Sequence, residues 1–260
     1  MTRSTPRLFL SHLRELGVDL APKEPGAEIR PRKLFRALSR RGFEIEQTKP
    51  TAAVLRGFGF QPESVIDIGV DQGTPMIYDA FPQAKFLLVD PLIESKQRVQ
   101  KYEGKLDFRF ECCALGPEDG NITVNIPSTA TKTRTSRATA MEFEGRNKAQ
   151  FASFETREVP MRRLDSLTAD LQGPIGIKID TEGFELEVVK GATETLKRTE
   201  FVLAEANVKR RYVGGYRFSE LVSFMGQNGF EILDFPRPIR PESDDCDVLF
   251  ARYDSARFDF

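Results

Sequence analysis

The stretch SVIDIGVDQG, residues 64–73, decides the fold of this chain, together with KFLLVD at residues 85–90. Aliphatic and β-branched residues fill the start of the first stretch, which predicts a buried strand. Two glycines then predict a turn, and residues 74–81 are typical of a helix. The second stretch predicts another strand, which ends at Asp90. Strand, glycine turn, helix and strand form a βαβ unit, from which doubly wound sheets are built.

The acid at the end of the second predicted strand lies where a ribose-binding acid is expected. Asp90 follows Asp67 by 23 positions, near the offset of about 20 residues that is typical of such an acid. Its carboxylate can accept hydrogen bonds from two sugar hydroxyls, and Gly69 and Gly73 let the backbone approach a ligand closely. The dinucleotide fingerprint is absent, because it needs glycine at the position of Asp71.

Asp-x-Gly-x-x-x-Gly, with an acid ending the next strand, resembles the first two motifs of class I S-adenosylmethionine (SAM) methyltransferases. The resemblance implies a Rossmann-like α/β sheet with helices on both faces. An acidic loop at Asp71 suits SAM, because this cofactor has an ammonium group and no diphosphate. The alternative is a glycine turn in some other doubly wound domain.

Composition limits the classes of protein that need to be considered. The chain has 260 residues with 40% hydrophobic and 30% charged residues, so it can form a sizeable core. A formal net charge of −1 argues against a general nucleic-acid binder. No stretch approaches the roughly 20 apolar residues of a membrane span. The odd number of cysteines, Cys112, Cys113 and Cys246, predicts reduced thiols and a cytoplasmic location.

Residues 1–60 are predicted to form a basic helical extension, followed by a methyltransferase domain over residues 61–260. The extension has twelve Lys or Arg residues against six Asp or Glu, and it contains His12, the only histidine. The simplest interpretation is a solvated helix face. The alternatives are a cap over the active site that holds an anionic group of the acceptor, or a contact within a homo-oligomer.

Two further segments are expected near the ligand. Residues 106–110 alternate apolar and charged side chains and predict a third strand, so the loop after it, with Cys113 and Ala114, is a candidate adenine contact. Its alternative is a plain loop with buried thiols. Residues 126–156 are polar, small and basic at their start, which predicts a long loop or a partly disordered lid.

Acidic residues are expected at the ends of three strands, at Asp90, Asp180 and Glu205. Because parallel strands end at one edge of a sheet, these acids predict a cleft there. Asp180 and Glu182 would flank the entry of a methyl acceptor, as candidate catalytic residues. A carboxylate with a raised pKa, or Lys178, is the candidate general base.

A divalent metal is the alternative use of these acids. Asp180, Glu205 and Asn207 offer the oxygen ligands that Mg²⁺ accepts, and a metal could lower the pKa of a substrate hydroxyl. Acids at strand ends do not by themselves indicate coordination, so we predict a site without metal.

The second half of the chain resembles the FkbM family of methyltransferases. The resemblance rests on IKIDTEGFE at 177–185, VVKGA at 188–192, ALG at 114–116, DG at 119–120, LD at 164–165 and DVLF at 247–250. With the glycine loop it covers about residues 60–255. The motif residues of the family correspond here to Asp67, Gly69, Gly73, Asp90, Asp180 and Glu182. One departure is that the loop, usually Gly-Ala-Asn-x-Gly, contains the bulkier Val70 and the acidic Asp71.

The family resemblance implies a SAM-dependent O-methyltransferase that acts on a hydroxyl of a sugar, glycan or secondary metabolite. The predicted cofactor contacts are Asp67, Gly69, Asp71, Gly73, Asp90, Cys113, Ala114 and Asp180. One alternative is a non-catalytic protein that binds SAM or its demethylated product, SAH, on the same fold. Another is a nucleotide-sugar or dinucleotide enzyme. Asp71 argues against this class, because it stands where the dinucleotide fingerprint needs glycine.

Overall fold

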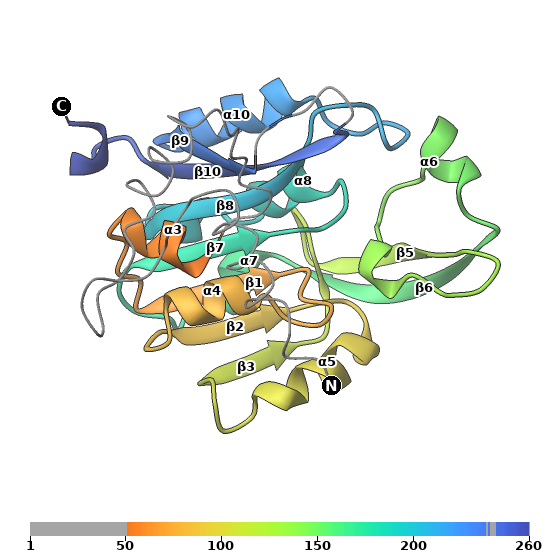
Figure 1. Cartoon of the computed structure of the whole chain (residues 1–260), viewed down its shortest axis with the longest axis horizontal. Coiled ribbons are helices and arrows are strands. Elements are labelled where there is room, and N and C mark those ends of the chain that lie inside the picture. Colours follow the sequence, from red (N-terminus) through yellow and green to blue (C-terminus); the bar gives the residue numbers. More distant parts are fainter. Residues whose placement is uncertain (1–50, 238, 240–242, 260) are drawn as a thin grey trace, which may run out of the picture. The chain divides into compact units, whose positions relative to one another are not determined.

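The computed structural model describes residues 51–237, 239 and 243–259, which are built around a seven-stranded sheet (Figure 1). Its strands are β1 (Ser64–Ile68), β2 (Lys85–Val89), β3 (Phe108–Glu111), β7 (Ile175–Ile179), β8 (Thr199–Asn207), β9 (Phe230–Arg237) and β10 (Asp245–Arg252). The spatial order is β3-β2-β1-β7-β8-β10-β9, and β10 alone runs in the direction opposite to the other six strands. The chain reverses its direction of winding between β1 and β7, which makes their carboxyl ends the switch point.

Helices cover both faces of this sheet, as the class I methyltransferase prediction requires. One face packs against α3 (Ala52–Gly57), α4 (Pro75–Ala80) and the end of α5 (Ile93–Val99). The other packs against α7 (Leu164–Leu167), α8 (Glu185–Lys190), α9 (Thr193–Leu196) and α10 (Phe218–Gln227). Alternation along β1 explains the two cores, because Val65 faces the first set of helices and Ile66 faces the second. The α/β fold class is therefore confirmed.

Most of the predicted extension, residues 1–50, lies outside the described residues. The remaining ten residues pack with the sheet domain, because Leu55 and Phe60 are buried in the same core as α4. Thr51 caps α3, since its hydroxyl accepts a hydrogen bond from the Val54 amide. The predicted domain boundary at residue 61 thus falls after α3, the first helix within the described residues.

A small second sheet stands beside the carboxyl ends of the main strands (Figure 1). It contains β4 (Ala114–Leu115), β5 (Gly120–Ser128) and β6 (Ser153–Arg162), in the order β4-β6-β5. The prediction of irregular structure over residues 126–156 was wrong at both ends, because β5 and β6 pair along their whole length. We call the connection between them, residues 129–152, the strap; it includes a 3-10 turn (Thr135–Arg137) and α6 (Gly145–Ala149).

Aromatic packing anchors the far part of the strap. The ring of Phe143 is fully buried, with its centroid 5.1 Å from those of Phe151 and Tyr212 and 5.6 Å from that of Phe154. Phe143 also forms an isolated antiparallel bridge with Tyr212. The strap is therefore tied to the segment that follows β8.

The sequence of residues 184–198 predicts one continuous helix, but the structure divides this segment into α8 and α9. Gly191 ends α8 and lies against the backbone of Gly116, where an added Cβ atom would be 2.0 Å from the carbonyl oxygen. The Asp165 carboxylate then accepts hydrogen bonds from the amides of Glu194 and Thr195, at 3.1 and 2.8 Å, in the first turn of α9. Helical propensity alone does not reveal this break, because its cause is a contact distant in sequence.

No helix within the described part of the chain is long and apolar enough to cross a membrane.

We expect Gly191→Ala to lower the free energy of unfolding by roughly 1–3 kcal/mol, because the new methyl group collides with a backbone that cannot rotate away. Gly226→Ala in α10 is the matched control, since a Cβ atom there meets nothing within 4 Å. In that control the free energy of unfolding should rise by roughly 0.5–1 kcal/mol, because the unfolded chain has lower entropy. Urea unfolding measures both, and equal stabilities would contradict the packing described here.

Candidate functional site

A cavity of about 250 Å³ lies at the carboxyl ends of β1, β2 and β7, which is the switch point of the sheet. We call it the central cavity. The glycine loop after β1, the residues following β2 and β7, the start of β4 and the strap all contribute to its lining. The sheet edge and the strap therefore enclose one site.

The glycine loop approaches the neighbouring strand end too closely for any side chain. Gly69 has φ +76°, and a Cβ atom there would lie 1.7 Å from the carbonyl oxygen of Asp180. Gly73 has φ +93° and faces the ring of Tyr102, 2.5 Å from where its Cβ would be. Both glycines line the central cavity, so the backbone itself forms this wall.

The two unusual residues of the loop both line the central cavity, and each has a partner elsewhere in the fold. Val70 is buried and packs in the core that includes α4. Asp71 takes a left-handed conformation with φ +42°, and its carboxylate forms an ion pair with Arg98 of α5. Arg98 also donates a hydrogen bond of 2.8 Å to the hydroxyl of Thr135 in the strap. The acidic loop is thus neutralised and connected to the strap by one guanidinium group.

Asp67 lies beneath the loop and is absent from the cavity lining. Its side chain is fully buried and accepts hydrogen bonds from the hydroxyls of Tyr78, at 2.6 Å, and Thr74, at 3.1 Å. Both partners belong to the loop and helix after β1. We therefore assign Asp67 to support of the glycine loop, in place of the predicted contact with a cofactor.

Asp90 follows β2 and lines the central cavity next to the glycine loop. One carboxylate oxygen accepts from the amide of Asp71, at 3.0 Å, and the other from the amide of Leu92, at 2.9 Å. Burial raises the pKa of Asp90 despite these hydrogen bonds, which favour its charged form. The backbone on both sides holds this carboxyl group at the cavity wall.

A buried ammonium group connects the loop to the acids of β7. Lys178 Nζ lies 3.2 Å from the carbonyl oxygen of Gly69, 3.4 Å from the carboxylate of Asp180 and 3.5 Å from that of Asp67. Burial by itself would lower the pKa of Lys178, but the carboxylates around it outweigh that effect and raise the pKa. Lys178 therefore stays protonated, which argues against its candidate role as a general base.

The turn after β7 is held by Glu185 at the start of α8. The buried Glu185 carboxylate accepts hydrogen bonds from the amides of Thr181 and Gly183 and from the hydroxyl of Tyr216. This turn places Asp180 and Glu182 in the lining of the central cavity. The acidic side chain in the first turn of α8 thus shapes the site without entering it.

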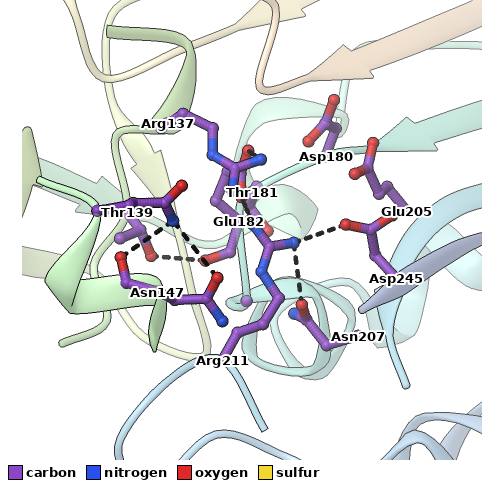
Figure 2. Close-up of polar contacts among 12 residues, drawn as sticks. Arg137, Thr139, Asn147, Asp180, Thr181, Glu182, Glu205, Asn207, Arg211 and Asp245 are labelled. Atoms are coloured by element: carbon purple, nitrogen blue, oxygen red, sulfur yellow. Dashed lines mark hydrogen bonds and ion pairs between the residues drawn. The ribbon is translucent and has the colours of Figure 1, made fainter. Parts of the chain in front are cut away.

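Glu182 is held from two sides (Figure 2). Arg211 and the hydroxyl of Tyr212 contact one carboxylate oxygen at 2.8 and 2.9 Å, while Arg137 of the strap lies 3.4 Å from the other. The Thr139 hydroxyl also donates a 2.7 Å hydrogen bond to the Glu182 backbone carbonyl. Burial and then the charge of Asp180 raise the pKa of Glu182 in spite of these partners. Glu182 is therefore a junction between strap and sheet.

Two of the three residues considered as metal ligands are engaged by arginines. Glu205 lies 3.4 Å from the Arg237 guanidinium, and the side-chain oxygen of Asn207 accepts a hydrogen bond from Arg211 at 3.3 Å. Glu205 also lies within β8, which continues to Asn207, so the prediction that it ends the strand was wrong. Among the described residues there is no group of three or more His, Cys, Asp and Glu side chains that could hold a metal ion.

The far wall of the central cavity is apolar. Cys113 and Ala114 line it together with Leu115 and Val124. Burial raises the pKa of the Cys113 thiol to about 12, so this sulfur stays neutral at physiological pH. The wall offers small side chains and no charge.

The structure brings eight of the nine predicted site residues to one cavity and leaves only Asp67 outside its lining. Sequence reasoning expected a loop or lid over residues 126–156, but it missed which strap residues line the cavity, Thr135, Ser136 and Thr139, and it missed the tethers Arg98 and Arg211. The length and polarity of the strap were the signal that it has a function. The two arginines had no such signal, because their partners are distant in sequence.

The chain also matches a known protein family. A family model described as the methyltransferase FkbM domain matches residues 67–232, a range that spans the motif residues from Asp67 to Glu182. No curated protein sequence matches the chain.

Solved structures show distant likenesses. Magnesium protoporphyrin IX methyltransferase from Synechocystis PCC 6803, with bound SAM, is 12% identical with a TM-score of 0.42, and the alignment covers 95% of this chain and 96% of that one. Fibrillarin from Aeropyrum pernix, with natively bound SAM, is 10% identical with a TM-score of 0.42, over 84% of this chain and 74% of that one. Ribosomal protein L11 methylase from Lactobacillus delbrueckii subsp. bulgaricus is 13% identical with a TM-score of 0.39, over 77% and 76%.

The carboxyl groups near the site predict a pH dependence of stability. Burial and the charges of Asp180 and Asp245 raise the pKa of Glu205 to about 8 from its usual 4.5. Between these values the folded protein holds a proton that the unfolded chain releases, so this group makes stability fall as the pH rises from about 5 to 8. Glu205→Gln mimics the protonated group and should flatten that slope, leaving the variant more stable than the parent at pH 8.

Urea unfolding at pH 5.5 and pH 8 measures this effect. Glu231→Gln is the control, because Glu231 is exposed on β9. An unchanged slope in Glu205→Gln would mean that Glu205 is ionised throughout this range.

Proposed function

Because the chain belongs to the methyltransferase FkbM domain family, we propose that it transfers a methyl group from SAM to a hydroxyl of a sugar, glycan or secondary metabolite. The family match confirms the resemblance predicted from the sequence, and it implies SAM as the methyl donor. The observation that carries the proposal is the central cavity, where the glycine loop, Asp90 and Asp180 meet at the switch point.

The lining of the central cavity fits SAM. The backbone of Gly69 and Gly73 lines the cavity, which suits a close-lying aminoacyl group. Asp90 is the candidate acceptor for two ribose hydroxyls, and the neutral wall at Cys113 and Ala114 suits an adenine ring. Asp180 supplies negative charge for the ammonium group, whereas the charge of Asp71 is taken up by Arg98.

SAM supplies an electrophilic methyl group when it is bound. The chain must orient the acceptor oxygen and take the proton that this oxygen loses. Asp180 is the better candidate for the proton acceptor, because its carboxylate lines the cavity and is one-third exposed, with Lys178 as its polar contact. Glu182 has two arginines and a tyrosine on its carboxylate, so we assign it the task of positioning the strap and the acceptor.

The engagement of Glu182 also favours a second candidate function, a protein that binds SAM or SAH without turnover. Incubation with labelled SAM and panels of sugars, glycans and polyketide alcohols separates the two. Formation of a methyl ether supports the enzyme, whereas binding of SAM without any labelled product supports the binding protein. Methylation of nitrogen or carbon acceptors alone would contradict O-methyl transfer.

Asp90→Ala should weaken SAM binding by roughly 1–3 kcal/mol, the range for loss of a charged hydrogen-bond partner. Calorimetric titration with SAM measures the change. Asp107→Ala serves as the control, because Asp107 is exposed at the amino end of β3, away from the cavity. Unchanged affinity in Asp90→Ala would remove this residue from the cofactor site.

Methyl transfer should persist in EDTA, because the oxygen groups of Glu205 and Asn207 are occupied by arginines. The measurement is the initial rate of methyl transfer to an acceptor found in the SAM screen, before and after chelation. Loss of activity that magnesium restores would instead make Asp180, Glu205 and Asn207 metal ligands.

A further inference from the structure

Two segments that border the site are strongly basic. The strap (residues 129–152) and the segment 208–217 after β8 together have nine Lys and Arg residues against two Glu, in a chain whose net charge is −1. They lie side by side, since the Glu144 amide donates to the Arg211 carbonyl and the Val213 amide to the Glu142 carbonyl, each at 2.9 Å. Positive charge is thus concentrated at one place.

Segment 208–217 lines a second cavity of about 590 Å³, which we call the arginine cavity. Its charged lining residues are Lys209, Arg210, Arg211, Arg217 and one acid, Glu144. The lining also includes Gly214 and Gly215, which leave the backbone accessible.

The arginine cavity and the central cavity share a wall. Glu182 lines the central cavity, and the next residue, Gly183, lines the arginine cavity. Arg211 and Tyr212, which bind the Glu182 carboxylate, line the arginine cavity as well. A molecule with one end in the arginine cavity would therefore be next to the residues that border the central cavity.

Some of the nine cations already have acidic partners. Arg137 and Arg211 contact Glu182, Lys148 contacts Glu142, and Lys209 lies 3.8 Å from Asp244. Within the described part of the chain, the remaining five have no ion pair: Lys132, Arg134, Arg146, Arg210 and Arg217. Of these, Arg210 and Arg217 line the arginine cavity and are exposed.

We propose that the methyl acceptor carries a phosphate group and that the arginine cavity holds it, chiefly through Arg210 and Arg217. The inference rests on the proposed methyl transfer and names the class of its acceptor. Two planar guanidinium groups can each give paired hydrogen bonds to phosphate oxygens, and together they match the double charge of a phosphate monoester. The single acid of the lining, Glu144, leaves an excess of positive charge for this anion.

Calorimetric titration of the full chain with inorganic pyrophosphate, in the presence of SAH, tests the proposal without a known acceptor. The double variant Arg210→Gln/Arg217→Gln should weaken pyrophosphate binding at least tenfold and leave SAH affinity within twofold. Lys85→Gln is the matched control, because Lys85 is an exposed cation at the amino end of β2. Citrate, titrated in parallel, should bind more weakly than pyrophosphate.

The proposal is overturned if the parent protein does not bind pyrophosphate, or if the double variant binds pyrophosphate as tightly as the parent does. It is overturned as well if Lys85→Gln weakens pyrophosphate binding as much as the double variant does. It is also overturned if citrate binds as tightly, since the site would then not select phosphate. Failure to bind SAH is a different result and would count against the proposed function.

Discussion

The site depends on one buried ammonium group. Lys178 on β7 and Asp67 on β1 are paired in the register of the two central strands, and Lys178 also contacts Asp180 and the carbonyl of Gly69. Removing one partner from such a group is strongly destabilising, because it leaves an uncompensated charge in the interior. The glycine loop and the acidic turn after β7 are therefore fixed relative to each other by the same contact.

Polar contacts extend from this centre to both sides of the central cavity. On the side of β1, Asp67 binds Thr74 and Tyr78, which hold the loop and helix α4. On the side of β7, Glu185 holds the turn that carries Asp180 and Glu182. Fully satisfied buried networks of this kind rigidify a structure, which suits a site that must orient two reactants.

The strap completes the site by contacts with both sides. Arg98 connects Asp71 of the glycine loop to Thr135, and Thr139 donates to the carbonyl of Glu182. Residues of the strap therefore line the same cavity as residues from the ends of three strands. A segment outside the large sheet thus connects the two sides of the central cavity.

The sequence by itself determined the sheet and most of the cavity. The βαβ pattern at residues 64–90 and the motif at 177–185 predicted β1, β2 and β7, and an acid directly after a parallel strand must lie at the carboxyl edge, as Asp90 and Asp180 do. Both signals are local, because periodicity and glycine spacing act over a few residues.

Tertiary structure alone decided the rest, because the deciding contacts join residues distant in the chain. Gly191 breaks a predicted helix against Gly116, and Asp67 is drawn beneath the loop by Tyr78 and Lys178. Arg211 reaches Glu182 from 29 positions away. Side-chain partners of this kind depend on how elements pack, which no local pattern of residues specifies.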